Sequence, residues 1–346
     1  MKKNLIFLII SITGLLAAQN SNFYSDITFE TTYKKNVLKL SQSDLDRFES
    51  GNETDKFHLE TSDDLITSAK VGLNLKHRIL AGHTQINRFT IKYSKFLKND
   101  LLDNFNIGFT LKQYLSKKIN FGIYYNFYPE IYVNRYDSVL DEELIFRDFT
   151  YSKNSYIGKL NYSLNDKIHL NYKFGFSQLF YNEFFTEYDV ENFENGISIK
   201  IIPNDWIRIN TNYSYKISNA KATDAFDEPE LISIIKDASS KIDVFDISID
   251  FPNILSINSS TIPFGFKVKY EHTFFQTQTE IDEYHYGRED KTVAIDTYVK
   301  HNILKPISVK YFYNFKFRDT GSPYSNVETD KEYNLYEIGL SVNLSI

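Results

Sequence analysis

The chain has 346 residues, of which 26 are Tyr and 29 are Phe, while Cys is absent and Met, Trp and Pro are scarce. That length allows one large domain or two ordinary ones, and no stretch has the Pro, Gly and Ser bias of a linker, so we expect a single domain. The net charge of −6 argues against a general nucleic-acid binder. The absence of Cys excludes a disulfide framework and a lipidated cysteine anchor.

The N-terminal segment, MKKNLIFLIISITGLLAAQ, has the layout of a secretory signal peptide. Two lysines precede an apolar run from Leu5 to Leu16, and two alanines follow it. The run is short for a permanent membrane-spanning helix, although an uncleaved anchor is the alternative interpretation. We therefore predict an export signal over residues 1–18 and one mature domain over residues 19–346.

The mature sequence alternates between apolar and polar residues. In the stretch DKIHLNYKFGFSQLFY, for example, Ile168, Leu170 and Tyr172 alternate with His169 and Asn171. Successive side chains of a β-strand point to opposite faces, so such a strand has one apolar face and one polar face. We find about fourteen segments of this kind, most of them about ten residues or longer. Their apolar positions fall in residues 27–33, 65–75, 89–93, 105–111, 119–127, 156–162, 168–176, 197–201, 207–215, 245–251, 264–270, 293–299, 307–315 and 336–346.

The connections between segments alternate between short and long. Short turn sequences lie at Ser116, Asn165 and Pro203. Long polar stretches cover residues 34–64, 133–149, 181–194, 218–241, 276–291 and 318–332. Short turns at one end and long loops at the other are typical of a transmembrane β-barrel with periplasmic turns and extracellular loops. Both termini then fall on the turn side, and the connection at 252–263 is long for that side.

A secreted β-sandwich or β-helix is the alternative, since both also alternate. Spanning strands are longer than soluble ones, and the apolar phase here lacks charged residues in its central part, as a lipid-facing surface requires. Aromatic residues near segment ends, such as Tyr93, Tyr125 and Phe315, suit the interfacial girdles of a barrel. We therefore predict an all-β fold, an up-and-down antiparallel transmembrane barrel of about 14 strands, within a range of about 12 to 16.

The final segment, EIGLSVNL, resembles the C-terminal signal that Gram-negative outer-membrane β-barrel proteins present to the barrel-assembly machinery. The matching residues are Glu337, Gly339, Val342 and Leu344, whereas the chain ends in Ile346 instead of the usual Phe or Trp. The resemblance covers nearly all of the mature chain. It implies insertion in outer-membrane lipid and an encounter with the assembly machinery. In line with the net charge we expect no nucleic-acid partner, and no motif indicates a cofactor.

The polar phase of the strands is rich in Lys and Arg although the whole chain is acidic. We predict that these cations line the lumen and form a candidate solute path: Lys70, Arg88, Lys92, Lys112, Lys159, Lys173, Lys200, Arg208, Lys267, Lys269, Lys310 and Lys316. The same phase also holds Lys76, Lys216, Lys300 and Arg318. It contains fewer acids, namely Asp26, Glu30, Asp246, Asp250, Glu271, Asp296 and Glu337.

Most of the remaining acids gather in the predicted loops, at residues 137–143, 183–194, 224–230 and 280–290. A basic wall around a narrow aqueous space concentrates anions, because the low-dielectric surround focuses the field. Alternatively, the loop carboxylates fold inward and neutralise the wall. Contacts of loop acids with Lys173, Lys267 or Lys269 would favour the second possibility.

The sequence offers little support for metal binding or catalysis. The acidic loops lack the spacing of a calcium-binding loop, so ordinary solvated loops are favoured over a metal site. His285 is the most plausible general base among the histidines, but no serine in a recognisable elbow matches it, and we expect a solvated loop histidine. The single Trp206, beside a short turn, is expected to be an interfacial anchor.

We therefore expect a channel or porin-like protein with a basic, anion-favouring lumen, located in the outer membrane of a Gram-negative bacterium, and not an enzyme. The first alternative is a non-transporting structural or assembly partner in a larger outer-membrane complex. An outer-membrane hydrolase is a more distant possibility. The identity of any solute or protein partner is not encoded in a recognisable motif.

Overall fold

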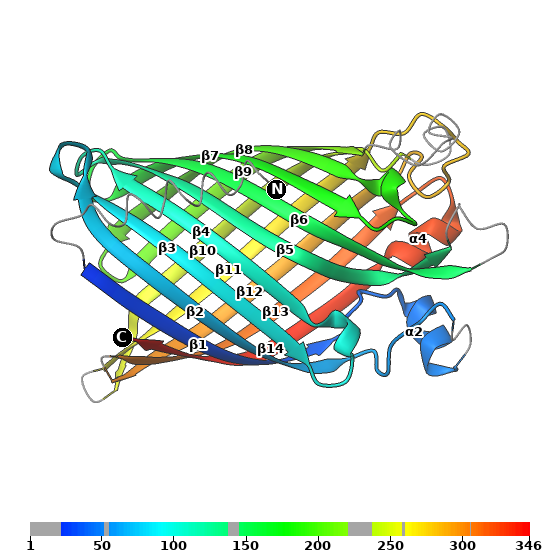
Figure 1. The fold of residues 1–346 in the computed structure, drawn as a ribbon, viewed down its shortest axis with the longest axis horizontal. Coiled ribbons are helices and arrows are strands. Elements are labelled where there is room, and N and C mark those ends of the chain that lie inside the picture. Colours follow the sequence, from blue (N-terminus) through cyan, green and yellow to red (C-terminus); the bar gives the residue numbers. More distant parts are fainter. Residues whose placement is uncertain (1–21, 52–54, 138–144, 221–236, 258–259, 305) are drawn as a thin grey trace.

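The computed structural model describes residues 22–51, 55–137, 145–220, 237–257, 260–304 and 306–346, and in it fourteen antiparallel strands form one closed barrel (Figure 1). Each strand pairs with its neighbours in the chain, and β1 pairs with β14 to close the wall. The predicted fold class, strand count and up-and-down order are confirmed. The predicted signal peptide and most of the acidic stretches 137–143 and 224–230 lie outside the described residues.

The strands match the fourteen predicted segments one for one. Their bounds are β1 Asn22–Lys35, β2 Asp64–Ile79, β3 His83–Phe96, β4 Asn104–Tyr114, β5 Ile119–Asp137, β6 Phe146–Ser163, β7 Ile168–Tyr181, β8 Val190–Asn204, β9 Ile207–Ala220, β10 Ser240–Ile257, β11 Ser260–Phe275, β12 Glu289–Leu304, β13 Ile307–Gly321 and β14 Tyr333–Ser345. Short 3-10 turns lie at Leu80–Gly82, Asp100–Leu102 and Thr186–Tyr188, and two short α-helices are α2 Gln42–Glu49 and α4 Ser325–Lys331.

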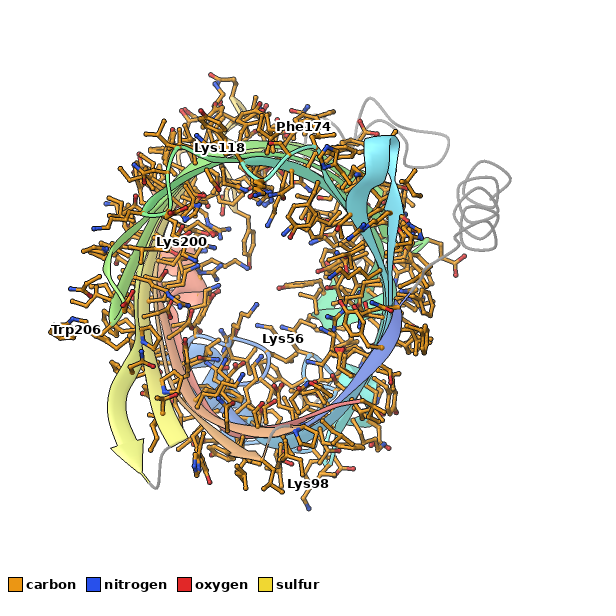
Figure 2. The ribbon with its side chains drawn as sticks, turned by 90° about the vertical axis from the view of Figure 1, so that its left-hand side faces the viewer. Lys56, Lys98, Lys118, Phe174, Lys200 and Trp206 are labelled. Carbon is orange, nitrogen blue, oxygen red and sulfur yellow. The ribbon has the colours of Figure 1, made fainter. Side chains whose placement is uncertain are left out.

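The barrel is inside-out compared with a soluble protein. On β7, Tyr172 and Phe174 are 50% and 46% exposed, although they belong to the apolar phase. Figure 2, which looks along the barrel from its turn end, shows Phe174 on the outer side of the wall and Lys200 on the inner side. Because adjacent side chains alternate across the sheet, every strand presents its apolar phase outward and its polar phase to the lumen. The outward apolar surface is therefore suited to lipid.

The turn end of the barrel holds both ends of the sheet. Ser25 and Ile346 exchange two backbone hydrogen bonds, of 2.9 and 2.8 Å, so β1 starts beside the end of β14. The start of β1 and the C-terminus therefore both lie on the turn side, as predicted for the two ends of the barrel wall. The prediction of a long turn over residues 252–263 is wrong, since β10 runs to Ile257 and β11 starts at Ser260. A register shift after Phe251 accommodates the prolines and polar residues that disguised this strand.

The strands extend further at the loop end than the sequence suggested. β5 and β6 have 19 and 18 residues and stay paired as far as Asp137 and Phe146, with two register shifts on the way. β8 starts at Val190 and β12 at Glu289. Part of each predicted loop is therefore strand, because the polar residues near strand ends hid the alternation.

The loop end carries the two α-helices, which Figure 1 shows beyond the wall at the end opposite the C-terminus. The hydroxyl of Ser41 accepts a hydrogen bond from the Asp44 amide at 3.0 Å and so caps the start of α2. Arg47 of α2 lies 3.4 Å from Asp330 of α4, which joins the 36–63 loop to the 322–332 loop. Among the described residues, no helix is both long enough and apolar enough to cross a bilayer.

Candidate functional site: the inner wall of the barrel

All twelve cations of the predicted solute path lie on the lumen face. Figure 2 shows that Lys200 points into the lumen. Directly paired residues on adjacent strands share a face of the sheet, so the register partner of an inward residue also points inward. His169 is the partner of Lys200 and shares its side of β7 with Lys173, which in turn pairs with Lys159 on β6. The same reasoning, applied from strand to strand, identifies the lumen face of all the remaining strands.

Five of these twelve cations form ion pairs with acids of the wall, and Lys34, outside the twelve, forms a sixth pair. The pairs on the lumen face are Arg88–Asp26 (2.5 Å), Lys92–Glu30 (3.7 Å), Lys173–Glu194 (2.6 Å), Lys267–Asp246 (3.3 Å), Lys269–Glu271 (2.7 Å) and Lys34–Glu337 (3.2 Å), the last formed by a lysine that the sequence prediction had placed in a loop. All of their carboxylates belong to strands. Neutralisation is therefore local and partial.

The partner of Lys173 corrects one part of the sequence interpretation. Glu194 was assigned to an acidic loop, yet it lies on β8 with its carboxylate turned to the lumen. Lys267 and Lys269 instead meet acids that were already predicted to line the wall. Asp290, also assigned to a loop, is near the start of β12, where Arg288 binds it at 2.6 Å.

Several other lumen cations lie over aromatic rings, a contact that the sequence interpretation missed. The Nζ atom of Lys112 is 4.9 Å from the ring centre of Tyr114, and that of Lys159 is 5.1 Å from the ring of Tyr124. The Nζ atom of Lys310 lies 4.9 Å from the ring centre of Tyr298 and 5.6 Å from that of Phe312. The Nζ atom of Lys316 lies 5.9 Å from the ring centre of Tyr333. An aromatic face holds an ammonium group without cancelling its charge.

These rings had a detectable signal in the sequence. Tyr124, Tyr298 and Phe312 occupy polar-phase positions of strongly alternating strands, where an aromatic side chain has to face the lumen. The three side chains are partly buried. An aromatic residue that breaks the alternation of a barrel strand is therefore informative about the lumen.

Three pairs of lysines directly oppose each other on the lumen face. The register pairs are Lys70 with Lys92, Lys159 with Lys173, and Lys300 with Lys310. Like charges at directly opposed positions destabilise a sheet. Their repetition on three strand pairs shows that the wall keeps closely spaced positive charges at some expense of stability.

The positive charge is strongest near the turn end. Nine inward cations lie within about five residues of the turn-side ends of their strands: Lys76, Arg88, Lys112, Lys159, Lys173, Lys200, Arg208, Lys300 and Lys310. The rise per residue of a strand sets their height in the wall. Among the described residues, the inward acids at this height are Asp26, which Arg88 binds, and Asp250, which directly opposes Arg208 near the turn-side end of β9. The acids that pair with other cations lie further toward the loop end.

The loop end is organised by contacts within the 36–63 loop and between separate loops. Figure 2 shows Lys56 of the 36–63 loop within the outline of the wall, and its Nζ atom lies 2.9 Å from Asp44. Lys331 of α4 lies over the ring of Tyr284 at 4.7 Å. Burial, together with the nearby positive charges of Arg288 and Arg318, lowers the pKa of Lys331 to about 7. The loops therefore reach across the mouth.

The expectation of a solvated His285 is wrong. The residue is 8% exposed, its Nδ1 lies 2.9 Å from the carboxylate of Asp282, and the centre of the Phe275 ring is 5.1 Å from that of the imidazole. This arrangement fixes the 276–288 loop. Within the part of the chain that the structure describes, no Ser or Thr hydroxyl is bonded to this ring, and no group of three acidic or histidine side chains could hold a metal ion.

Trp206 and the residues of the predicted assembly signal have clear positions. Trp206 is 58% exposed and points outward at the turn end (Figure 2), as an interfacial anchor would. On β14, Val342 and Leu344 face outward, Glu337 pairs with Lys34, and Gly339 opposes Phe312 on the lumen face. Recognition of these residues by the assembly machinery stays a prediction.

An even number of antiparallel strands, an apolar exterior and a polar lumen define the architecture. The fold is that of a Gram-negative outer-membrane β-barrel. Neither a family model nor a curated protein matches the sequence. The resemblance inferred from the sequence is thus confirmed at the level of fold.

Solved structures of similar shape include outer-membrane proteins. The outer-membrane channel DcaP of Acinetobacter baumannii has 10% identity and a TM-score of 0.48, over 94% of this chain and 97% of that one. An anion-selective porin from Comamonas acidovorans has 8% identity and a TM-score of 0.43, over 94% and 99%. A bacterial polysaccharide outer membrane secretin has 8% identity and a TM-score of 0.45, over 93% and 97%. These values assign no function to this chain.

Proposed function

We propose that this barrel is an outer-membrane channel that passes small anionic solutes. The carrying observation is the uneven pairing of the lumen charges: five of the twelve predicted path cations meet carboxylates, while Lys112, Lys159, Lys310 and Lys316 rest on aromatic rings. A cation on a ring keeps its charge. In a narrow passage with low-dielectric walls, such charges raise the local concentration of anions and lower that of cations.

The distribution of charge along the wall also supports a preference for anions. Solutes that leave the mixed-charge loop end enter a region near the turns where Asp26 faces several cations, among them Lys76, Lys159 and Lys200. The increase in positive potential toward this region draws anions inward. With about fourteen strands, a barrel is wider than an eight-stranded one that its own side chains fill.

Planar bilayers with the purified full-length protein test the proposal. A KCl gradient is expected to give a reversal potential that reports higher permeability to chloride than to potassium. The triple variant Lys112→Gln, Lys159→Gln, Lys310→Gln is expected to reduce that preference several-fold. A matched control removes three exposed lysines that lie outside the lumen, Lys98, Lys241 and Lys291.

Two outcomes would count against the proposal. A reversal potential that favours potassium would reject an anion channel. Absence of conductance from correctly folded protein would instead favour the non-transporting role in a larger outer-membrane complex, and co-purification of stoichiometric partners would then be the next observation to seek.

A further inference from the structure

Four lumen residues on β12 and β13 form a compact block of two cations and two aromatic rings. Lys300 directly opposes Lys310, and one step further along the same face Tyr298 directly opposes Phe312. The Nζ atom of Lys310 lies 4.9 Å from the ring centre of Tyr298 and 5.6 Å from that of Phe312. The register thus brings two lysines and two rings to adjacent positions of the lumen face, with the ammonium group of Lys310 over both rings.

The neighbouring strands hold both rings against the wall. Phe312 directly opposes Gly339 of β14, and its ring occupies the space that a side chain at Gly339 would fill. Tyr298 has the same relationship to Gly265 of β11. Because glycine lacks a Cβ atom, the rings lean sideways over the neighbouring strands and do not project across the lumen. They form a partly apolar floor beside the two lysines.

The charges around this block leave its lysines available. Neither Lys300 nor Lys310 has a carboxylate within ion-pair distance in the described part of the chain. Two inward acids occupy positions next to the block. Asp250 accepts a hydrogen bond from the Tyr298 hydroxyl at 2.8 Å, and Asp296 directly opposes Lys267. Arg208 directly opposes Asp250 on the next strand pair and adds a third cation near the block.

The block differs from the other two lysine pairs of the wall. Lys92 of one pair meets Glu30, and Lys173 of the other meets Glu194, so one lysine of each is engaged by an acid. The Lys300–Lys310 pair has no such neutralising partner among the described residues, and it is also the pair flanked by two directly opposed rings. An anion placed between these lysines would relieve their mutual repulsion.

We propose that Lys300, Lys310, Tyr298 and Phe312 form a binding site for anions that carry a ring, either an aromatic ring or a sugar ring. The two ammonium groups bind the carboxylate or phosphate, and the ring of the ligand packs on Phe312 and Tyr298. This proposal rests on the proposed function and names the class of solute that the channel selects. Small anions without a ring make the contact with the two lysines but not the packing contact with the aromatic rings.

Isothermal titration calorimetry on the detergent-solubilised, full-length barrel tests the site without requiring conduction. The probes are benzoate, glucuronate and acetate, each with one carboxylate at neutral pH. We expect benzoate or glucuronate to bind at least about ten times more tightly than acetate, a difference of about 1.4 kcal/mol. Tighter benzoate indicates an aromatic acid as the solute class, and tighter glucuronate indicates a sugar acid.

Two variants separate the halves of the site. Lys300→Gln with Lys310→Gln is expected to weaken binding of all three probes by about ten-fold or more. The control Lys291→Gln, which removes an exposed lysine on the outer face of the same strand, should leave all three affinities unchanged. Phe312→Leu keeps an apolar side chain over Gly339 and is expected to abolish the preference for rings while preserving acetate binding. Heat-dependent gel migration verifies that each variant is folded.

The outcomes of this test and of the conductance test are distinct. Equal affinity for acetate, benzoate and glucuronate, or unchanged benzoate affinity after loss of both lysines, overturns the ring-anion site even if the channel prefers chloride. Ring-selective binding that depends on Lys300 and Lys310 in a barrel that prefers potassium retains the site and overturns the anion-channel proposal.

Discussion

Lys173 Nζ lies 2.6 Å from Glu194 Oε1, on the lumen faces of the neighbouring strands β7 and β8. Each of the two side chains keeps about a quarter of its surface exposed, 26% and 25%. The pair shows how this wall moderates its charge: an acid on a strand neutralises one cation while Lys159, directly opposite Lys173, stays on the ring of Tyr124.

Removal of this acid is expected to increase anion preference. Glu194→Gln leaves Lys173 without its carboxylate, so the chloride-to-potassium permeability ratio should rise, by about two-fold or more if the field of one uncompensated charge acts in the lumen. The cost in stability should be small, about 1 kcal/mol or less, because partly exposed ion pairs contribute little. Reversal potentials measure the first effect, and thermal unfolding in detergent measures the second.

A matched control for this variant is Glu283→Gln, which removes an exposed acid in the 276–288 loop. It should leave the permeability ratio nearly unchanged. An equal change in both variants would mean that the overall charge of the protein, and not the Lys173–Glu194 pair, sets the selectivity.

Gly339 is expected to tolerate larger residues poorly because of Phe312. A Cβ atom at this position meets the end of the Phe312 ring, so Gly339→Val should destabilise the barrel by about 1–3 kcal/mol, the usual range for overpacking. The midpoint of urea unfolding in liposomes measures this effect. Combining it with Phe312→Ala should recover most of the loss.

The same pair of variants tests the predicted assembly signal. If the assembly machinery reads Gly339 itself, the level of Gly339→Val in the outer membrane should stay low in the double variant, although its stability recovers. Recovery of both quantities would assign Gly339 a packing role alone.

The contact between α2 and α4 is expected to restrain the outer mouth. Arg47→Ala removes the contact with Asp330 and should increase hydrogen exchange in the 322–332 loop, with a loss of local stability of about 0–1 kcal/mol because both side chains are partly exposed to solvent. Exchange followed by mass spectrometry measures it. The charge swap Arg47→Asp with Asp330→Arg should restore protection, and failure of the swap would indicate that other contacts of Arg47 hold the helix.

Lys331 is expected to make the 322–332 loop more stable as the pH rises above neutral. Its pKa is lowered from 10.5 to about 7, mainly by burial and then by Arg288 and Arg318, while Asp330 and Asp44 act in the opposite direction. Between these two pH values the open loop binds more protons than the closed loop. The free energy of opening should therefore increase, by at most about 1.4 kcal/mol per pH unit, and less where Lys331 keeps contact with water.

Hydrogen exchange at pH 6.5 and pH 9, corrected for the intrinsic exchange rate, measures this dependence. Lys331→Met should remove it, whereas Lys291→Met, which alters an exposed lysine outside the lumen, should not. A pH dependence that persists in Lys331→Met would mean that another group controls the loop.

The strand order and the direction of each side chain could be predicted from the sequence because both depend on local periodicity. In a closed up-and-down barrel each strand pairs with its chain neighbours, so the alternation at Ile168, Leu170 and Tyr172 already indicates which face of β7 meets lipid. The twelve path cations followed from the same rule. The long turn at 252–263 was a wrong prediction because prolines and a register shift interrupt the pattern that the rule needs.

The partners of the lumen residues could not be predicted in the same way. Which acid reaches Lys173, which ring lies beneath Lys310 and which loop covers His285 depend on strand register and on contacts between distant loops. Glu194 shows the difference, since its neighbours in the sequence suggested a loop while its register placed it on the wall.

The sequence by itself therefore determined the sheet, its two faces and the basic character of the lumen, because a period of two residues acts within each strand. Only the tertiary structure decided how that charge is distributed. Closure of the barrel brings residues from separate strands to fixed heights, so that some lysines meet carboxylates, others rest on rings, and Lys300 and Lys310 face each other with Tyr298 and Phe312 beside them.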